Sequence, residues 1–474
     1  MVNNFRVCFL LNVTFCRSDL SLGVYEGTAT KLAADYRVEL AKHIDDEFDQ
    51  TSFISRCKDG SEGVFTRQPT LTLKHLLLLI MSSRSSIQRG LDEFYQKVNS
   101  EDYSIREVTK GAFSMARNKV NEWGFQRLNE VCVDFFYQRA PYHKWHDFRL
   151  LAVDGSWLQL PNHPTIKEEF VQVRTERNAD RSYSMATCSL LYDVLNQISL
   201  DAQLGPYQNS SKKKAGEKAL LEGHLPSMKP GDLVLFDRGY PSKLLFFKLF
   251  AKGVDFCMCM KGSWWKEVRA FRESDQQEIL VEFELDNKAL LKLENYPQPI
   301  ALKQTCRLIK VVLDTGEVEI LCTSLTDIKK YPIQEFGELY HKRWHEEEAY
   351  KLLKNRVEVE RFSGKTAKAV KQDFFAKVFL MSLTAAYAHP IEEKVKAEYK
   401  ADESRKHDQK INRTNALAMT RNILVGMFDK SDYRQALKAF DNIVFKTREI
   451  IRPSRKNKRK HRPKKSYYMN HKPL

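Results

Sequence analysis

The sequence feature that most constrains this chain is a stretch rich in helix formers, residues 340–354, which reads YHKRWHEEEAYKLLK. It contains no glycine or proline, so it predicts one helix. Because an α-helix turns by about 100° per residue, one narrow face of this helix carries a hydroxyl, a guanidinium, a carboxylate and an ammonium group. These groups belong to Tyr340, Arg343, Glu347 and Lys354.

Two other glutamates of the same helix are predicted to lie elsewhere. By the same arithmetic Glu346 and Glu348 point well away from the shared face, so Glu347 is the glutamate of interest. A simpler alternative is a solvated charged face whose opposite charges pair four residues apart. The helix by itself does not decide between these two interpretations.

Two apolar runs upstream each end in an aspartate. Residues 150–156 read LLAVDGS, and residues 233–240 read LVLFDRGY. Each run predicts a short buried strand that delivers Asp154 or Asp237 at its carboxyl end. An Asp-Gly pair also commonly opens a turn, and for either aspartate taken alone a simple turn is the favoured interpretation. All three stretches occurring in this order favour one site that joins both aspartates to Glu347.

Taken together, these stretches resemble the DD(E/D) transposases of the IS4 group of bacterial insertion sequences. That group carries a signature of Tyr, two residues, Arg, three residues, Glu, six residues and Lys. Here Tyr340, Arg343, Glu347 and Lys354 match every spacing. The second aspartate of the family is typically followed, after one residue, by glycine and an aromatic residue, as in the DRGY segment of this chain. The resemblance begins at about Asp154 and extends more loosely to both ends of the chain.

The resemblance implies an enzyme that binds the ends of its insertion sequence and performs cut-and-paste DNA cleavage and strand transfer. It makes Asp154, Asp237 and Glu347 the catalytic residues and the ligands of two Mg²⁺ ions, for which Mn²⁺ is expected to substitute. Two such ions can activate the attacking oxygen and stabilise the leaving oxygen of a phosphodiester. Three carboxylates are a sufficient protein contribution, because Mg²⁺ prefers hard oxygen ligands and keeps several waters.

The other signature residues are expected to contact DNA. Arg343 and Lys354 would hold phosphates of the bound DNA, and Tyr340 would hydrogen-bond a phosphate near the cleaved end. The expected partners are the terminal inverted repeats and the target DNA, with a homodimer assembled on the DNA. No Walker-type glycine-rich loop occurs, so no nucleotide cofactor is expected.

Composition supports a nucleic-acid partner. The chain has 474 residues, a net charge of +16 and an isoelectric point near 9.2, which favours a polyanion, nucleic acid before membrane. A solubilising surface charge is the alternative. The nine cysteines are scattered without a Cys-x-x-Cys pair, which fits a reducing cytoplasm. No apolar run is expected to reach membrane-spanning length, and the cysteine pattern favours a cytoplasmic protein. The resemblance to bacterial insertion-sequence transposases implies a bacterial, nucleoid-associated one.

From Phe148 onward the pattern changes from helices to strands. A three-strand meander is followed by a basic helix at 210–225, the Asp237 strand, a second helix, another strand and finally the Glu347 helix. This is the element order of the ribonuclease-H-like fold, in which parallel strands bring their ends to one edge. Three further strands predict a β insertion at about 262–326, with a hairpin turn at 314–317. The expected fold is an α/β ribonuclease-H-like catalytic core with a β-rich insertion, flanked by helical N- and C-terminal regions.

The same patterns predict the domain boundaries. They are a poorly ordered N-terminus (1–27), a helical DNA-end-binding domain (28–145), the catalytic domain (146–390), a helical region (391–451) and a basic disordered tail (452–474). The start of the chain also faintly suggests a signal peptide, but an upstream translation start is the favoured explanation. The tail carries nine Lys or Arg residues up to Lys465, as expected of an electrostatic DNA arm.

Three local predictions are more specific. Residues 104–120 predict a helix, a glycine turn and a second helix, read either as a helix-turn-helix or as a plain hairpin with a basic face. A strongly apolar helix at 369–389 is predicted to end at Pro390, because proline breaks helices. Trp264 and Trp265 are either a base-stacking platform or, as we favour, core residues. The residues that the second helix of 104–120 would present are Ser114, Arg117, Asn118 and Lys119.

Two other classes of function compete with the transposase interpretation. One is a DNA-binding protein that keeps the fold and has lost catalysis. The other is a ribonuclease-H-like nuclease unrelated to mobility. The intact carboxylates and the unbroken signature disfavour the first, and the signature together with the two DNA-binding ends disfavours the second.

Overall fold

The structure, a computed structural model, describes residues 23–60, 65, 70–83, 86–170, 172–175, 178–207, 215–263, 265–285, 291, 296, 299–313 and 316–452. The predictions for residues 1–22, for the tail from residue 453 and for Trp264 lie outside these residues. So do part of the turn at 314–317 and the first residues of the predicted helix at 210–225. Helix α1 (Gly23–Asp49) already begins inside the segment predicted to be poorly ordered.

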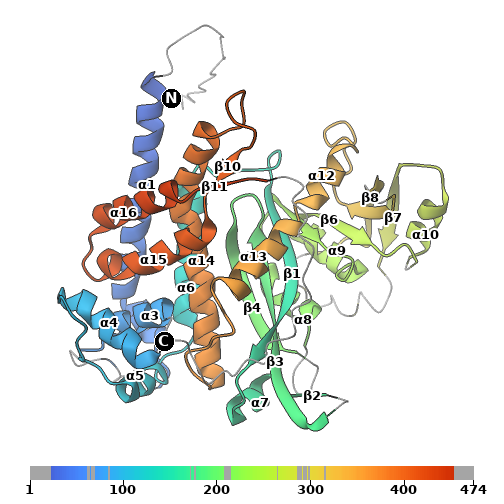
Figure 1. Ribbon diagram of the computed structural model, residues 1–474. Helices are drawn as coiled ribbons and strands as arrows, with labels where there is room; N and C mark the ends of the chain where they lie inside the picture. Colours follow the sequence, from blue (N-terminus) through green and yellow to red (C-terminus); the bar gives the residue numbers. More distant parts are fainter. Residues whose placement is uncertain are drawn as a thin grey trace, which may run out of the picture.

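Within the described residues, nine strands form one mixed sheet at the centre of the protein (Figure 1). They are β1 (Arg149–Leu160), β2 (Gln172–Thr175), β3 (Asn178–Asp193), β4 (Ile198–Pro206), β5 (Asp232–Phe236), β6 (Asp255–Met260), β7 (Glu278–Glu284), β8 (Lys303–Val312) and β9 (Val318–Thr323). The strand order is β2-β3-β1-β5-β6-β9-β8-β7, and β4 pairs with β3.

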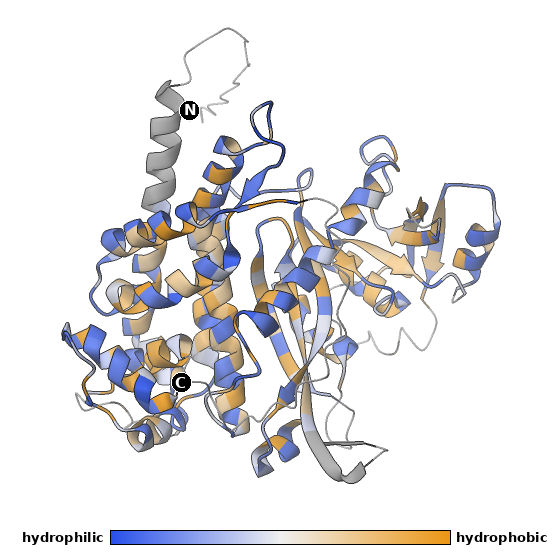
Figure 2. Ribbon diagram, viewed as in Figure 1, coloured by the Kyte–Doolittle hydropathy of each residue, from blue (hydrophilic) through white to orange (hydrophobic). Residues whose placement is uncertain are grey.

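The part of the sheet with the order β4-β3-β1-β5-β6 fits a ribonuclease-H-like core. Strands β1, β3 and β4 are an antiparallel meander, and β5 and β6 run parallel to β1. The connecting helices are α7 (Pro164–Phe170), α8 (Glu217–His224) with a short 3-10 turn (Leu225–Ser227), and α9 (Lys243–Ala251). Every residue of β5 is buried, as expected of a parallel strand covered on both faces. The orange, hydrophobic strands at the centre of Figure 2 belong to this sheet.

The strands predicted as an insertion continue the same sheet. Strand β9 pairs antiparallel with β6, β8 pairs with β9, and β7 forms the edge. Helix α10 (Lys266–Glu273) precedes them, and α12 (Glu335–His341) and α13 (Trp344–Asn355) follow. At the start of this segment Trp265 packs against Phe246 and Phe283, with ring centroids 5.2 and 5.1 Å away, which agrees with the core-packing interpretation.

Helices from both ends of the chain form one body beside the sheet (Figure 1). The N-terminal ones are α1, α2 (Thr51–Cys57), α3 (Leu73–Ser82), α4 (Ile87–Asn99), α5 (Lys110–Arg117) and α6 (Trp123–Arg139). The C-terminal ones are α14 (Ala367–Glu398), α15 (Arg413–Phe428) and α16 (Tyr433–Lys446), with a small hairpin of β10 (Gln409–Lys410) and β11 (Glu449–Ile450). Helix α14 contacts α1, α3, α6, α15, α16 and β4, so it is the central helix of this body.

Helix α14 also corrects a prediction from the sequence. No apolar run was expected to reach membrane-spanning length, yet α14 is long and apolar enough for a span. Of its most apolar window, 94% is buried inside the protein. Neighbouring helices therefore cover the apolar surface that a membrane would otherwise contact.

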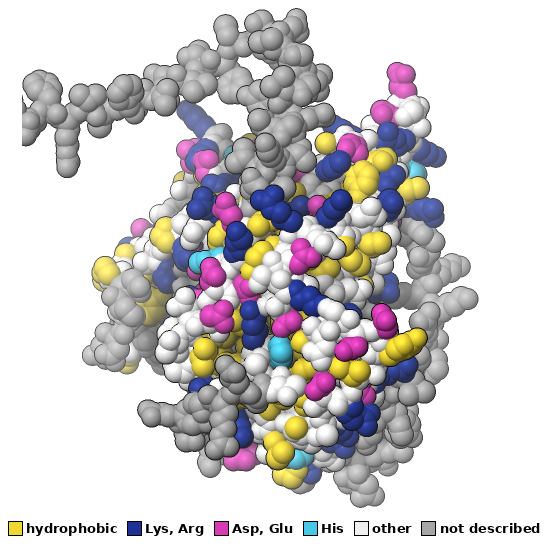
Figure 3. Space-filling model, turned by 90° about the vertical axis from the view of Figure 1, so that its left-hand side faces the viewer, with side chains coloured by type: hydrophobic (Ala, Val, Ile, Leu, Met, Phe, Trp, Pro, Cys, Tyr) yellow, Lys and Arg dark blue, Asp and Glu magenta, His cyan; other side chains and the backbone are white. Residues whose placement is uncertain are grey.

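The helical face of the molecule carries charges of both signs. Figure 3 shows Lys and Arg side chains interspersed with Asp and Glu over this face. The positive net charge is therefore not gathered into one uniform basic patch in this view.

The prediction that Pro390 ends its helix is wrong, because α14 continues through Pro390 to Glu398. Proline has no N–H to bond the carbonyl four residues earlier, which is that of Ala386. The hydroxyl of Tyr36 on α1 donates a hydrogen bond of 2.6 Å to this carbonyl. Arg37 Nη1 donates to the next carbonyl, that of Tyr387, at 3.1 Å. The Tyr36 side chain, 350 residues away in the sequence, thus satisfies the carbonyl that the proline leaves free.

We expect Tyr36→Phe to destabilise the protein by about 1–3 kcal/mol, because it leaves the buried Ala386 carbonyl without a donor. Urea unfolding measures this change. The matched background is Pro390→Ala, in which residue 390 regains an N–H for the same carbonyl. In the Pro390→Ala background, Tyr36→Phe should lower the free energy of unfolding by clearly less than in the parent. Equal costs in both backgrounds would show that Tyr36 does not compensate for the proline.

The predicted pair of helices at 104–120 is also wrong. In this fully described stretch the helical residues are those of α5 alone, and Gly111 lies inside α5. Thr109 explains the start, since its side chain accepts the N–H of Ala112 and caps the helix. Arg117, which the predicted second helix would present on its outer face, is instead 4% exposed and bonds Gln372 and Asp373 of α14.

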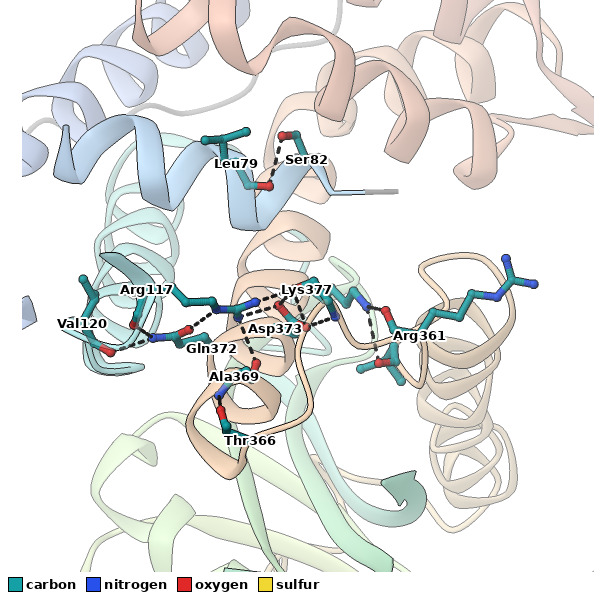
Figure 4. Close-up of polar contacts among 12 residues, drawn as sticks. Leu79, Ser82, Arg117, Val120, Arg361, Thr366, Ala369, Gln372, Asp373 and Lys377 are labelled. Carbon is teal, nitrogen blue, oxygen red and sulfur yellow. Dashed lines mark hydrogen bonds and ion pairs between the residues drawn. The ribbon is translucent and has the colours of Figure 1, made fainter. Parts of the chain in front are cut away.

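Arg117 is instead the centre of a buried polar cluster (Figure 4). Its guanidinium donates to Gln372, Ser363 and Asp373 at 2.9, 2.6 and 3.1 Å. Lys377 in turn donates to backbone carbonyls between residues 358 and 361. Burial raises the pKa of Asp373, but Arg117, Lys377 and the hydrogen bonds from Ser363 together outweigh burial and hold that pKa below its usual value. The cluster ties α5 and α14 to the segment that follows α13.

Candidate active site

The strand register brings Asp154 and Asp237 to the same place. Strands β1 and β5 pair in parallel with Val153 opposite Phe236, so the two aspartates follow directly at neighbouring positions. Strand β5 ends there, while β1 continues to Leu160 paired with β3. The carboxylates therefore stand at the edge where the parallel part of the sheet stops, as the sequence predicted.

Helix α13 adds Glu347 and Arg343 to this edge. Arg343 Nη1 lies 3.8 Å from Asp154 Oδ2, and Arg343 Nη2 lies 3.9 Å from Glu347 Oε1. The guanidinium is thus placed between two of the three predicted carboxylates. Burial raises the pKa of Asp154, and the charges of Asp237 and Glu347 raise it further while Arg343 opposes them. The strand register and the two contacts of Arg343 bring the three carboxylates to the same edge of the sheet.

The helix predicted over residues 340–354 is in fact two helices. Helix α12 ends at His341, Lys342 and Arg343 form a turn, and α13 begins at Trp344. The prediction that Glu346 points away from the site is therefore wrong. Glu346 is completely buried, and its Oε1 accepts the backbone N–H of Asp154 at 2.8 Å.

The remaining signature residues differ in their surroundings. The hydroxyl of Tyr340 is buried and donates to the carbonyl of Phe236, the residue before Asp237, at 3.2 Å. Lys354 is half-buried. It lies near Cys188 on β3, whose pKa is raised by burial and lowered by this lysine. The Tyr340 hydroxyl is thus hydrogen-bonded inside the protein, whereas Lys354 remains partly exposed.

Sequence reasoning missed two acidic residues at this edge, Glu346 and Glu217. Glu217 begins α8, and a Cβ built on Gly155 would lie 2.2 Å from its Cγ, so its side chain packs directly against that glycine. Burial raises the pKa of Glu217, and Asp154 and Asp237 raise it further. The sequence signal that could have pointed to Glu217 is an acidic residue at the start of the helix that precedes the Asp237 strand.

The donor set of this cluster suits a divalent cation. Asp154, Asp237 and Glu347 offer hard carboxylate oxygens, and their mutual repulsion is the kind of cost that a bound cation removes. As arranged, no group of three such side chains among the described residues is close enough to hold an ion. Arg343 lies between Asp154 and Glu347 and offsets part of their negative charge, which a bound cation would also do.

A ribonuclease-H-like sheet with aspartates at the ends of two parallel strands and a glutamate on a following helix defines the class of metal-dependent nucleic-acid enzymes. The family described as "Transposase DDE domain" matches residues 145–383, about half of the chain, and includes all three acids. The chain belongs to this family of DDE transposases and to its IS4 group. The general function of that family is DNA cleavage and strand transfer, which confirms the resemblance seen in the sequence.

Individual relatives are more distant. The transposase InsG of insertion sequence element IS4 from Escherichia coli K12 is 24% identical over 345 residues, which cover 70% of this chain and 73% of InsG. The putative transposase InsZ of the same strain is 25% identical over 150 residues, 31% of this chain and 47% of InsZ. Among solved structures, a piggyBac transposase synaptic complex with hairpin DNA aligns at a TM-score of 0.37 and 10% identity, covering 87% of this chain and 76% of that one.

Proposed function

We propose that this chain is an active transposase that binds the ends of its own insertion sequence. It cleaves them and joins them to target DNA by a cut-and-paste route, with Asp154, Asp237 and Glu347 as the catalytic carboxylates. The observation that carries this proposal is their convergence at one sheet edge from three separate parts of the chain.

In this proposal the carboxylates hold two Mg²⁺ ions, and Mn²⁺ substitutes for them. When bound, the ions activate the attacking oxygen and stabilise the leaving oxygen of a phosphodiester. Asp154 lies on β1, Asp237 directly follows β5, and Glu347 presents its carboxylate from the half-exposed side of α13. Arg343 neutralises Asp154 and Glu347 in the free protein and turns to a DNA phosphate when ions bind.

Other basic residues extend a DNA path from this edge. A hollow of about 300 Å³ next to the Asp237 segment is lined by three basic residues, Arg238, Lys261 and Arg272, and also by Glu317 and Glu319. Lys354, in the last turn of the helix that carries Glu347, is a further basic residue of this path. Tyr340 can reach a phosphate only by releasing the carbonyl of Phe236, and this buried bond favours a role in supporting β5.

The wider assembly belongs to the same proposal. The partners are the terminal inverted repeats and the target DNA, and a homodimer forms on the DNA, which places two active sites at two ends. We place the protein in the cytoplasm of a bacterium, associated with the nucleoid. Residues 28–145 bind the ends, and the basic segment beyond residue 452 adds sequence-independent affinity.

The experiment uses the purified full chain and labelled DNA taken from both sides of its gene. Strand cleavage should occur at the element ends with Mg²⁺ and stop with a chelator. Binding of the ends without cleavage in Mg²⁺ or Mn²⁺ would instead support a DNA-binding protein that has lost catalysis. Cleavage of unrelated DNA at the same rate would support a nuclease unrelated to mobility.

We expect Lys354→Ala to slow single-turnover cleavage of a pre-bound end by about 1–3 kcal/mol of transition-state stabilisation, as for a lost charged hydrogen bond. The dependence on Mg²⁺ should not change, because Lys354 is not a ligand. Lys351→Ala is the matched control, since Lys351 lies on the same helix, exposed and paired with Glu348. If added Mg²⁺ restored the full rate of Lys354→Ala, the lysine would act through the metal site.

A further inference from the structure

Two side chains of α13 hydrogen-bond the backbone of Asp154, one at its N–H and the other at its carbonyl. The N–H of Asp154 donates to Glu346 Oε1 at 2.8 Å, and its carbonyl accepts from the hydroxyl of Tyr350, also at 2.8 Å. Glu346 and Tyr350 are four residues apart and therefore neighbours on one face of the helix. Both are buried.

The Tyr350 hydroxyl also links β1 to its neighbour β3. It accepts the N–H of Leu190 at 3.0 Å, and Leu190 is the residue of β3 directly opposite Asp154. One phenol thus bonds both members of a strand pair at the register position of the catalytic aspartate. The parallel pairing of β1 with β5 stops one residue earlier, at Val153, so the sheet itself supports this position less.

A third contact reaches the same carbonyl from the other face of the sheet. Ser189 Oγ donates to the carbonyl of Asp154 at 3.0 Å. The serine is oriented by His224, whose Nε2 lies 2.9 Å from Ser189 Oγ and whose Nδ1 lies 2.6 Å from Asp201 Oδ2. Both acceptor directions of the Asp154 carbonyl are therefore occupied by buried hydroxyl groups.

Glu346 is an unfavourable residue for the fold alone. Its Oε2 is buried and has no hydrogen-bond partner among the described residues. An unsatisfied buried carboxylate oxygen costs stability, so its presence here calls for a reason other than packing. The reason that the geometry offers is the bond from its other oxygen to Asp154.

Resting on the function proposed above, we propose that Glu346 and Tyr350 are positioning residues for Asp154. They fix the backbone of Asp154 to the helix that carries Glu347, so the two carboxylates keep one relative position when ions and DNA bind. Sites work only while their groups are held closely in place, and a displacement of about 1 Å can cost on the order of a hundredfold in rate. The adjacent glutamates of α13 thus have separate tasks, since Glu346 holds the strand and Glu347 faces the reaction.

The test is Tyr350→Phe, which keeps the ring and removes both hydrogen bonds. Two quantities are measured on the full chain, the affinity for Mn²⁺ without DNA and the Mg²⁺ concentration that gives half-maximal single-turnover cleavage. We expect weaker Mn²⁺ binding, a higher half-maximal Mg²⁺ concentration and cleavage slower by about ten- to a hundredfold at saturation. The affinity for the DNA ends should stay that of the parent.

The matched control is Tyr387→Phe. Tyr387 is a fully buried tyrosine of α14 whose hydroxyl makes no hydrogen bond within the described part of the chain. Loss of this hydroxyl should leave the Mn²⁺ affinity and the Mg²⁺ dependence of cleavage unchanged. Metal dependence and rate equal to the parent in Tyr350→Phe would overturn the proposal.

Glu346 supplies a second, independent pair of variants. Glu346→Gln keeps an oxygen that accepts the Asp154 N–H, whereas Glu346→Ala removes it. Metal affinity should remain near that of the parent in the first and fall in the second, and equal behaviour of the two would overturn the proposal. This pair decides the matter if Tyr350→Phe does not fold. If the parent protein did not cleave DNA, the proposed function would be wrong. The Mn²⁺ affinities of the variants would still test whether Glu346 and Tyr350 position Asp154.

Discussion

Asp237→Ala is expected to abolish strand cleavage while the protein still binds the element ends. The loss should reach several kcal/mol of transition-state stabilisation, or roughly a thousandfold or more in rate, because two-ion catalysis fails without one of its carboxylates. The side chain of Asp237 accepts one hydrogen bond, from the N–H of Gly239 at 2.6 Å, so its removal disturbs little else. Single-turnover cleavage of a pre-bound labelled end measures the effect, and Asp154→Ala and Glu347→Ala should behave alike.

The structure determines which glutamate can serve as the control. Glu348→Ala should cleave like the parent, because Glu348 is exposed and paired with Lys351 on the outer side of α13. Glu346→Ala is unsuitable as a control, since Glu346 holds the N–H of Asp154. Cleavage by Asp237→Ala in Mg²⁺ would mean that the carboxylates are wrongly assigned.

Arg117→Ala is expected to produce the largest loss of stability, about 3–5 kcal/mol in the free energy of unfolding. It would leave Asp373, 2% exposed, buried without the guanidinium that now pairs with it at 3.1 Å. Urea unfolding monitored by circular dichroism measures the change. The matched control is Arg106→Ala, which removes the same charge from an exposed ion pair with Asp92 and should cost far less because water screens that pair.

The same ion pair predicts a pH dependence. The folded pKa of Asp373 is held below its usual value, so its stabilising contribution is complete above the unfolded pKa, near 3.9. It is lost as the pH falls from there through the lower folded pKa. In Arg117→Ala this contribution should be missing, and the decline in stability over that acidic range should be correspondingly smaller. An unchanged acid profile would contradict the role assigned to Arg117.

The neighbouring aspartates were predictable because their positions depend on strong local patterns. The apolar runs before Asp154 and Asp237 are long enough to be buried strands, and a helix between them allows parallel pairing. The register then follows, with Val153 opposite Phe236. The spacing of Arg343 and Glu347 likewise survives in the structure, since one turn of helix separates them.

The break between α12 and α13 was not predictable from local propensity. Lys342 and Arg343 are good helix formers, and propensity is a weak influence that tertiary contacts override. Two anchors lie on opposite sides of the break: Tyr340 bonds the end of β5, and Glu346 bonds β1. Those strands become visible as anchors only when the chain is folded.

Distant partners also explain the other differences. Pro390 follows the general rule for proline, but Tyr36 supplies the missing donor from the far end of the chain. Arg117 carries a charge that suggests a surface, and its buried acidic partner lies 256 residues away. Glu217 reaches the site because Gly155 leaves room for its side chain. None of these pairings can be inferred from a short window of sequence, because the partners lie far apart along the chain.

The contact between the first and the last helices affects how the protein is made. Arg37 on α1 pairs with Asp441 on α16, and the two residues are 404 positions apart. Helix α1 is synthesised early, and the face that it buries in the folded protein stays exposed until α14 and α16 have been synthesised and pack against it. During that time the catalytic sheet is already complete in sequence. A chain that stops before α16 therefore contains all three proposed catalytic carboxylates and still leaves apolar surface exposed, so we expect chaperones and proteases to act on it.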